Sequence, residues 1–223
     1  MSLGRRVRPR VVVAVDGPSG SGKSTVSRRL ANALDASYLD TGAMYRAATW
    51  AVLHAGVDLS DQEAIVKVVG DTDIFVGTDP AHQVVTVNGT GVEQAIRGTA
   101  VTGAVSAVSA IQAVRQVLVA RQREIIAAAE RIVVEGRDIG TVVAPDANLK
   151  VYLTASASER ARRRSVEYAS DHALTKADLA RRDHLDSTRT ADPLRQAPDA
   201  IVLDSTEMDI DQVVAYLREM VEA

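Results

Sequence analysis

The sequence predicts a three-layer α/β fold, in which a central parallel sheet lies between two layers of helices. Apolar runs rich in valine and isoleucine recur along the chain, as expected of strands that are buried on both faces. Stretches with the apolar spacing of helices separate these runs, which favours parallel pairing of the strands. The chain has 223 residues and is 46% hydrophobic, which suits a single domain with its own core.

The first elements alternate between strand and helix after a short basic segment. Residues 1–10 carry several arginines but lack the apolar stretch of a signal peptide, so we expect a solvated leader. The β-branched run at 11–15 predicts a buried strand, and residues 23–34 predict a helix with one apolar side. A short strand at 38–40 and a helix at 43–55 follow. This order is typical of the start of a parallel α/β sheet.

The middle of the chain changes in character and predicts a small antiparallel insert. Residues 60–63, Ser-Asp-Gln-Glu, have the spacing of a capping box, which predicts the start of a helix. The pair Asn88-Gly89 is a typical hairpin turn, and apolar runs at 74–76 and 84–87 predict short strands beside it. We expect the insert to span about residues 60–110.

The rest of the chain returns to alternating helices and strands. Helical spacing at 99–130 predicts two helices that break near Ala110. Two polar, arginine-rich helices are expected at 156–170 and 175–187. The remaining predicted elements are strands at 131–135, 150–153 and 200–203 and a closing amphipathic helix at 209–221.

A glycine-rich motif stands directly after the first predicted strand. Residues 17–24, Gly-Pro-Ser-Gly-Ser-Gly-Lys-Ser, match the P-loop pattern G-x-x-x-x-G-K-[ST] at every required position. The glycines let successive N–H groups turn towards a phosphate, and the next helix adds the positive end of its dipole. Lys23 can reach the β- and γ-phosphates, and the Ser24 hydroxyl can ligate Mg²⁺. The motif predicts a P-loop NTPase fold that binds ATP·Mg²⁺, whereas Thr25 at the third glycine position excludes a Rossmann dinucleotide site.

Composition excludes several classes of partner. A net charge of −3 and a pI of about 5.8 argue against attraction to nucleic acid or to an anionic membrane. Aromatic residues make up only 3% of the chain and offer little surface for stacking bases. Cysteine is absent, so a disulfide framework and a cysteine metal site are excluded. No apolar run approaches the roughly 20 residues of a membrane span. We therefore expect a cytoplasmic monomer without a nucleic-acid or membrane partner.

Arginines gather on two predicted helices although the net charge of the chain is negative. Arg160 and Arg164 are four residues apart and share one helix face, with Arg163 beside them. A second group with helical spacing consists of Arg182, Asp186 and Arg189. Any single arginine could be an ordinary solvated side chain. Two such groups favour a site that receives two polyanions.

A turn between two glycines follows the strand predicted at 131–135. It carries Arg137 and Asp138. In an open α/β sheet, ligands gather at the carboxyl ends of the strands, so this pair could read a ligand. It could equally be a structural salt bridge, and the residues alone leave both interpretations open.

A P-loop also leaves several functions open. The size of the chain disfavours a motor, and the N-K-x-D element of a switch GTPase is absent. The alternatives that remain are a small-molecule kinase acting on CMP, UMP, AMP or shikimate, and an ATPase or regulator whose arginines bind nucleic acid.

Four motifs, in their order along the chain, together resemble the bacterial cytidylate kinases. They are DGPSGSGKST at 16–25, DTGAMYR at 40–46, EGRDIGTVV at 135–143 and LDST at 203–206. The likeness runs from about residue 11 to the C-terminus, and the insert matches the enlarged nucleotide-binding region of that family. Thr41 stands where the family more often has serine, which keeps the hydroxyl. The resemblance implies ATP-dependent phosphorylation of CMP and dCMP to CDP and dCDP, with a helical lid at about 156–172.

The resemblance also implies roles for single residues. Those expected to hold ATP are Gly17, Pro18, Ser19, Gly20, Ser21, Gly22, Lys23, Ser24, Thr25 and Arg163. Those expected to bind the acceptor nucleotide are Thr41, Tyr45, Arg46, Ser106, Arg115, Arg137, Asp138, Arg182, Asp186 and Arg189. Those expected to act on the transferring phosphate are Lys23, Arg137, Arg160 and Arg164, with Ser24 as metal ligand.

The chemistry of cytosine agrees with Ser106, Arg115 and Asp138 as its readers. The base presents an amino donor beside two acceptors, so its pocket needs a carboxylate or hydroxyl and a guanidinium. Uracil replaces the amino donor with an acceptor, which the Asp138 carboxylate would repel.

Direct transfer to a phosphate needs no general base. The second pKa of a phosphomonoester is near 6, so the acceptor oxygen is already largely ionised at neutral pH. We expect electrostatic stabilisation and positioning by cations to provide the catalysis. The histidines therefore need no catalytic role. Conspicuous side chains expected only to pack are Met44, Trp50, Phe75 and Met208, and Asp16 is expected simply to end its strand.

Overall fold

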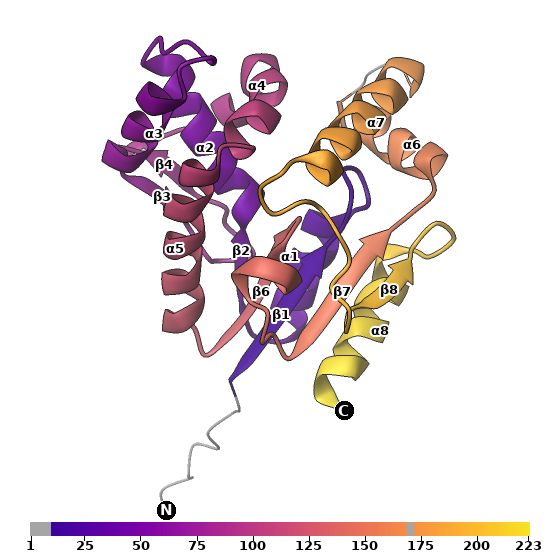
Figure 1. The fold of residues 1–223 in the computed structure, drawn as a ribbon. Coiled ribbons are helices and arrows are strands. Elements are labelled where there is room, and N and C mark those ends of the chain that lie inside the picture. The colour runs from indigo at the N-terminus through magenta and orange to yellow at the C-terminus, as the bar shows by residue number, and fades with distance from the viewer. Residues whose placement is uncertain (1–9, 169–171) are drawn as a thin grey trace, which may run out of the picture.

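The computed structural model describes residues 10–168 and 172–223 (Figure 1). Residues 1–9 of the expected leader and residues 169–171 of the expected lid lie outside the described residues.

The main sheet of the described chain has five parallel strands in the order β2-β6-β1-β7-β8. Their bounds are β1 Val11–Asp16, β2 Ser37–Asp40, β6 Arg131–Gly136, β7 Leu149–Thr154 and β8 Ile201–Asp204. The register pairs Asp16 at the end of β1 with Gly136 at the end of β6. The P-loop and the Gly136–Thr141 turn therefore leave the sheet side by side.

Helices cover both faces of this sheet, which confirms the predicted three layers (Figure 1). Val13 and Val15 of β1 belong to one buried cluster with side chains of α1 (Lys23–Ala33) and α8 (Ile210–Glu222). Val12 and Ala14 belong to a second cluster with α2 (Thr41–His54) and α5 (Gln112–Ala128). Alternate side chains of one strand thus serve two cores, as expected of a strand buried on both faces.

A second, antiparallel sheet lies beside α2 and α3 in Figure 1, within the segment predicted as the insert. It consists of β3 Ile74–Val76, β4 Val85–Val87 and β5 Thr90–Gly91. Asn88 and Gly89 join β4 to β5 with φ angles of 49° and 76°, which are those of the predicted two-residue hairpin turn. The neighbouring helices are α3 Gln62–Asp71, the 3₁₀ helix η1 Ala95–Arg97 and α4 Thr99–Ser109.

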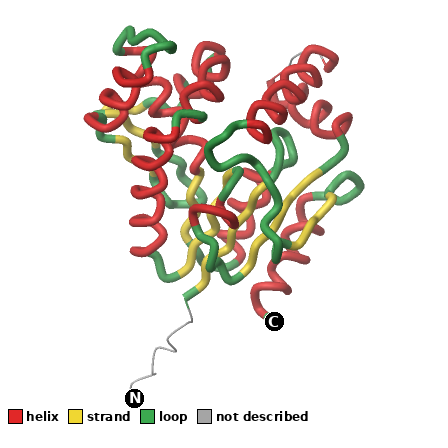
Figure 2. The backbone as a smooth tube through the Cα atoms, in the orientation of Figure 1, coloured by secondary structure: helices red, strands yellow, loops and turns green. Residues whose placement is uncertain are grey.

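Two helices, α6 (Ala157–Tyr168) and α7 (His172–Thr188), pack against each other at the carboxyl side of the sheet. Figure 1 shows them opposite α4, and Figure 2 shows the long loop that leads from α7 back to β8. Both helices were predicted, and the predicted end of the first, at about residue 170, lies outside the described residues.

Several predicted details were wrong at helix ends and on the small sheet. The helix predicted at 43–55 begins at Thr41, because the Asp40 carboxylate accepts a hydrogen bond from the Ala43 N–H and caps it. At α3 the cap is Asp61, which accepts from the Ala64 N–H, rather than Ser60. Phe75 does not pack in a core, since β3 turns it outward with 54% of its surface exposed.

Two further features of the fold did not follow from the pattern. Residues Ile139–Val143 form a short π-helix (η2), for which no helix was predicted. On α2, the rings of Trp50 and His54 stack with centroids 4.7 Å apart and an interplanar angle of 10°.

No single helix among the described residues has the length and apolar composition to cross a membrane; α4 and α5 pass that test only as a pair bent by 98°.

Candidate functional site

A cleft of about 980 Å³ opens at the carboxyl edge of the main sheet, between the P-loop, the start of α2, α4 and the α6–α7 pair. It brings together most of the residues singled out from the sequence. The three that lie outside its lining are Gly17, Pro18 and Arg160. Those that line it are Ser19, Gly20, Ser21, Gly22, Lys23, Ser24, Thr25, Thr41, Tyr45, Arg46, Ser106, Arg115, Arg137, Asp138, Arg163, Arg164, Arg182, Asp186 and Arg189.

The P-loop takes a backbone path that glycine makes possible. Gly17 has a φ of 149°, and a Cβ there would lie 2.0 Å from the Leu153 carbonyl oxygen of β7. Gly20 and Gly22 have φ angles of 77° and 88°, in the left-handed region that side chains disfavour. The glycines thus let the loop leave β1 close against β7 and curl back onto the start of α1.

Lys23 lies inside this curl. Its side chain is buried, and its Nζ donates a hydrogen bond of 2.8 Å to the Pro18 carbonyl. Burial, followed by repulsion from Arg137, lowers the Lys23 pKa to about 7. A bound phosphate would reverse the effect of that repulsion, because a nearby anion favours the charged amine. The loop is therefore suited to a polyphosphate.

Ser24 and Glu135 form the oxygen-rich side of the cradle. The Ser24 hydroxyl donates to Glu135 Oε1 at 2.8 Å. The other oxygen, Oε2, is buried, and no donor among the described residues makes a hydrogen bond to it. Burial and the nearby Asp40 carboxylate raise the Glu135 pKa. A hydroxyl, an orphaned carboxylate oxygen and a second carboxylate are the ligands that Mg²⁺ prefers, so these residues fit the ion.

Ser19 connects the P-loop to three other segments. Its hydroxyl accepts a hydrogen bond of 2.8 Å from Arg137 Nη2, while Arg137 Nε donates to Asp186 of α7 at 2.9 Å. The Ser19 N–H donates to Asp183 at 2.9 Å, and its carbonyl accepts from Arg160. Arg160 also forms an ion pair with Asp183. The α6–α7 pair is thus tied to the P-loop at one residue.

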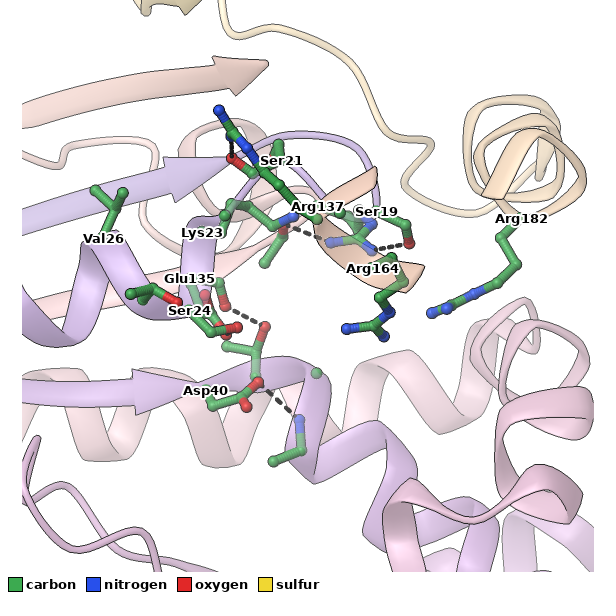
Figure 3. A pocket seen from close by; sticks show the side chains of 18 of the residues that line it. Ser19, Ser21, Lys23, Ser24, Val26, Asp40, Glu135, Arg137, Arg164 and Arg182 are labelled. Carbon is green, nitrogen blue, oxygen red and sulfur yellow. Dashed lines mark hydrogen bonds between the residues drawn. The ribbon is translucent and has the colours of Figure 1, made fainter. Parts of the chain in front are cut away.

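Three arginines come together where the two halves of the cleft meet. Figure 3 shows Arg164 and Arg182 reaching into the space beside Arg137. The Arg182 side chain is buried, and its Nε has no acceptor among the described residues. Burial, then repulsion from Arg137 and Arg164, lowers the Arg182 pKa. Such a concentration of positive charge is suited to a strongly anionic ligand.

A buried ion pair also lines the cleft. Arg115 Nη2 donates to Asp138 Oδ2 at 2.5 Å, and their side chains are 1% and 5% exposed. Arg189 Nη2 lies 3.7 Å from the other Asp138 oxygen, and the Arg115 guanidinium stands 5.2 Å over the Tyr45 ring. Burial raises the Asp138 pKa against the lowering influence of Arg115. The group offers a carboxylate and two guanidinium groups to a planar polar ligand.

The other predicted acceptor contacts surround this pair. Arg46 Nη1 donates to the Ile96 carbonyl and to the Thr102 hydroxyl, each at 3.0 Å, and its side chain borders the cleft. Ser106 lies on α4, and its carbonyl accepts a hydrogen bond from Ser109. The Thr41 hydroxyl donates to the Glu135 carbonyl at 2.7 Å. Residues about 95 apart in sequence are thereby joined at one edge of the sheet.

Asp16 has a clear structural task beyond ending its strand. Its two carboxylate oxygens accept hydrogen bonds of 2.8 Å from the Ile139 and Gly140 N–H groups. These bonds hold the start of η2 and so place Arg137 and Asp138. Burial nevertheless raises the Asp16 pKa to about 6.

Four carboxylates at or beside the site were missed as functional residues. Asp40 ends the short strand predicted at 38–40. Glu135 is the last residue of the strand predicted at 131–135. Its position at the carboxyl end of a strand, where ligands bind, could have indicated a functional role. Asp183 adjoins Arg182 on an arginine-rich helix, where it passes for an ordinary surface charge. Asp192, whose Oδ2 accepts from Arg115 Nε at 2.7 Å, lies in a loop without a motif. No pattern in the sequence marks it.

Comparisons with known proteins place nearly the whole chain in one family. A sequence model of the cytidylate kinase family matches residues 13–223. A cytidylate kinase from Rhodococcus jostii is 56% identical over 213 residues, which cover 93% of this chain and 93% of that protein. One from Nocardia farcinica is 56% identical (95% and 93% covered), and one from Geobacillus kaustophilus is 46% identical (96% and 98%).

Solved structures with low sequence identity share the fold. A gluconokinase from Sinorhizobium meliloti superposes with a TM-score of 0.51 at 16% identity, covering 96% of this chain and 94% of that one. An uncharacterized protein from Eubacterium ventriosum gives a TM-score of 0.56 at 10% identity, covering 96% and 99%.

Proposed function

The chain belongs to the cytidylate kinase family and catalyses the ATP-dependent phosphorylation of CMP; we propose that it accepts dCMP as well and that the γ-phosphate passes directly between nucleotides bound in one cleft. The observation that carries this proposal is that the P-loop, the arginine group and the buried Arg115–Asp138 pair line the same cleft.

ATP is proposed to lie along the P-loop. Backbone N–H groups of residues 19–25 would hold its phosphates, and Lys23 would neutralise the β- and γ-phosphates. Arg163 lines the cleft near the P-loop, where its Nη1 reaches the Ser21 carbonyl at 3.4 Å. It would lie against the triphosphate from the side of α6.

Ser24, Glu135 and Asp40 are proposed to hold Mg²⁺. When bound, the ion neutralises charge on the β- and γ-phosphates and fixes their geometry. Ser24 and Glu135 are already aligned by their mutual hydrogen bond of 2.8 Å.

CMP and dCMP are proposed to bind between α4 and the η2 turn. Asp138 would accept a hydrogen bond from the cytosine amino group, with Ser106 beside it, and Arg115 would donate hydrogen bonds to the base acceptors.

Arg46 and Arg137 would hold the acceptor phosphate, near the ends of Tyr45 and Thr41. Arg182, Asp186 and Arg189 would surround the sugar and phosphate. Uracil would place an acceptor against Asp138, which disfavours UMP.

Transfer itself is proposed to depend on cations and closeness rather than on proton transfer. The acceptor phosphate oxygen is ionised at neutral pH and can attack the γ-phosphorus in line, while the ADP oxygen leaves. Lys23, Arg137, Arg160 and Arg164 would stabilise the charge on the transferring group. Arg160 lies outside the cleft lining, bound to Ser19 and Asp183, so it would need to turn inward or act through Ser19.

The lid is proposed to span about residues 156–172, which include α6, and residues 60–110 are proposed to form the nucleotide-binding insert of a single domain. Both would close over the nucleotides and exclude water. The protein is also proposed to be a monomer, and the small nucleotide substrates favour a cytoplasmic enzyme without a nucleic-acid or membrane partner.

The test is ADP release from ATP·Mg²⁺ with CMP, dCMP, UMP, AMP, GMP and shikimate supplied one at a time. Fast release with CMP and dCMP alone is the expected result. A preference for UMP would overturn the role of Asp138. Stimulation by nucleic acid, with no response to any acceptor, would favour the ATPase or regulator instead.

A further inference from the structure

The loop between α7 and β8 carries an aspartate with an unusual backbone. Asp192 has a φ of 47°, in the left-handed region, where aspartate and asparagine are tolerated better than most side chains. In this conformation the side-chain carboxylate and the backbone carbonyl of Asp192 each bind an arginine of the acceptor side of the cleft. Its carboxylate accepts from Arg115 Nε at 2.7 Å, and its carbonyl accepts from Arg189 Nε at 2.8 Å and Nη2 at 2.5 Å.

Asp192 contributes a negative charge to the group around Arg115 and Asp138. Asp138 lies between two arginines, Arg115 in direct contact and Arg189 at 3.7 Å. Asp138 is buried between these two cations, and the buried Asp186 carboxylate also stabilises the charge of Arg189. The Asp192 carboxylate, whose side chain is 26% exposed, supplies Arg115 with a second negative partner, at Nε. Without it, Arg115 would keep Asp138 as its carboxylate partner but would lose the charge-assisted hydrogen bond at Nε.

Asp192 also helps to fix the orientation of the Arg115 guanidinium group. Arg115 donates to Asp138 through Nη2, to the Ser109 carbonyl through Nη1 at 3.2 Å and to Asp192 through Nε. A guanidinium held on all three sides cannot rotate, so the hydrogens that remain on its terminal nitrogens keep one direction. They are the donors that a cytosine ring would meet.

We propose that Asp192 is a positioning and specificity-determining residue, which orients Arg115 and Arg189 so that the acceptor pocket selects cytosine over uracil. This inference rests on the proposed function, because it assigns the Arg115–Asp138 pair to the acceptor base. Asp192 does not line the cleft, and it acts through the two arginines.

The loop has anchors of its own, so a variant at 192 should fold. The Leu194 N–H donates to the Asp186 carbonyl at 2.8 Å, and the Ala191 and Leu194 side chains are buried. Figure 2 shows the loop running from the end of α7 down to β8. Asp192→Gly keeps the left-handed turn and the carbonyl that binds Arg189, and removes only the carboxylate. Asp192→Asn keeps both the turn and an oxygen acceptor but loses the charge.

The experiment measures the KM for CMP, the KM for ATP, kcat and the CMP-to-UMP ratio of kcat/KM, together with CMP binding by calorimetry in the absence of ATP. In Asp192→Gly we expect the KM and Kd for CMP to rise by roughly tenfold, because a charge-assisted hydrogen bond is lost. The CMP-to-UMP ratio should narrow, while the KM for ATP and the melting temperature stay close to wild type. Asp192→Asn should recover part of the CMP affinity.

Asp35→Gly is the matched control. Asp35 is also an aspartate with a left-handed backbone, at φ 51°, and it lies after α1 outside the cleft lining. Its replacement should leave both nucleotide KM values unchanged.

Two outcomes would overturn the inference. One is wild-type CMP affinity and selectivity in Asp192→Gly. The other is an equal loss for ATP and CMP with a lowered melting temperature, which would indicate a purely structural loop. Asp138→Asn separates this failure from failure of the proposed function. If Asp138→Asn leaves the relative rates with the different acceptors unchanged, the acceptor site has been assigned to the wrong place. If Asp138→Asn changes these rates and Asp192→Gly does not, only the role proposed for Asp192 is wrong.

Discussion

The Arg137 guanidinium joins the P-loop to α7 and lies where the acceptor phosphate would meet ATP. It binds Ser19 and Asp186, and its side chain is 21% exposed. Arg137→Ala should lower kcat/KM for CMP by about 100-fold or more, because the transferring group loses a fixed positive charge. Steady-state ADP release measures this loss.

Arg181→Ala is the control for that variant. Arg181 lies on the same helix as Asp186 but is exposed and pairs only with Asp178 among the described contacts. Its removal should change kcat/KM by less than about twofold. Near-normal turnover in Arg137→Ala would remove Arg137 from the catalytic set.

A second residue, Asp16, should make stability depend on pH. Burial raises its pKa from 3.8 to about 6, so the folded state binds a proton more tightly than the unfolded state does. Stability contributed by this proton is complete below about pH 4 and is lost as pH rises towards 6. The full effect is at most about 3 kcal/mol.

Asp16→Asn removes that titration and keeps an oxygen acceptor for one N–H of η2. Urea unfolding between pH 4.5 and 7.5 should show the variant gaining stability relative to wild type as pH rises. A difference between the two proteins that does not change with pH would contradict the raised pKa.

Among the elements, α3 shows how a capping pattern can name the wrong residue. Ser60 and Glu63 have capping-box spacing, yet the Ser60 hydroxyl and N–H both donate to Asp58, and Asp61 caps the helix. Asp61→Ala should therefore cost about 1 kcal/mol of unfolding free energy. Ser60→Ala, the matched change one residue earlier, should cost clearly less. Equal losses in denaturant titration would contradict this assignment of the cap.

The P-loop is the element most sensitive to an added methyl group. In Gly17→Ala the new Cβ would lie 2.0 Å from the Leu153 carbonyl oxygen, at a positive φ. We expect a loss of more than about 3 kcal/mol from strain and overlap. Gly103→Ala is the control. That glycine lies within α4, and an added Cβ would meet no atom of another segment within 4 Å, so the variant should gain about 0.5–1 kcal/mol of unfolding free energy. Thermal unfolding of both variants distinguishes these effects.

The strands and helices could be predicted from the sequence because their signals are local. The run at 11–15, the Asn88-Gly89 turn and the break near Ala110 each depend on a few neighbouring residues. The P-loop motif could be predicted for the same reason. Contacts that join distant segments could not. Asp192 meets Arg115 across 77 positions, and Asp16 meets η2 across more than 120, with no local pattern to indicate either contact.

For the whole molecule, nucleotide binding should raise the melting temperature selectively. A ligand at 100 times its Kd contributes about 2.7 kcal/mol, which corresponds to roughly 5–10 °C in a protein of this size. CMP should give such a shift and UMP at the same concentration a smaller one, because Asp138 disfavours uracil. Asp138→Asn should reduce the difference between the two nucleotides. Equal shifts for CMP and UMP in the wild-type protein would contradict base selection by this pocket.

The stacked Trp50 and His54 side chains have a practical consequence. Trp50 is the single tryptophan of the chain, so nearly all long-wavelength ultraviolet fluorescence of the protein arises at one place on α2. Trp50 packs against the buried cluster that α2 shares with the small antiparallel sheet and with one face of the main sheet. The emission spectrum therefore reports on this half of the molecule alone, and an indole introduced on α7 would give the other half its own optical signal.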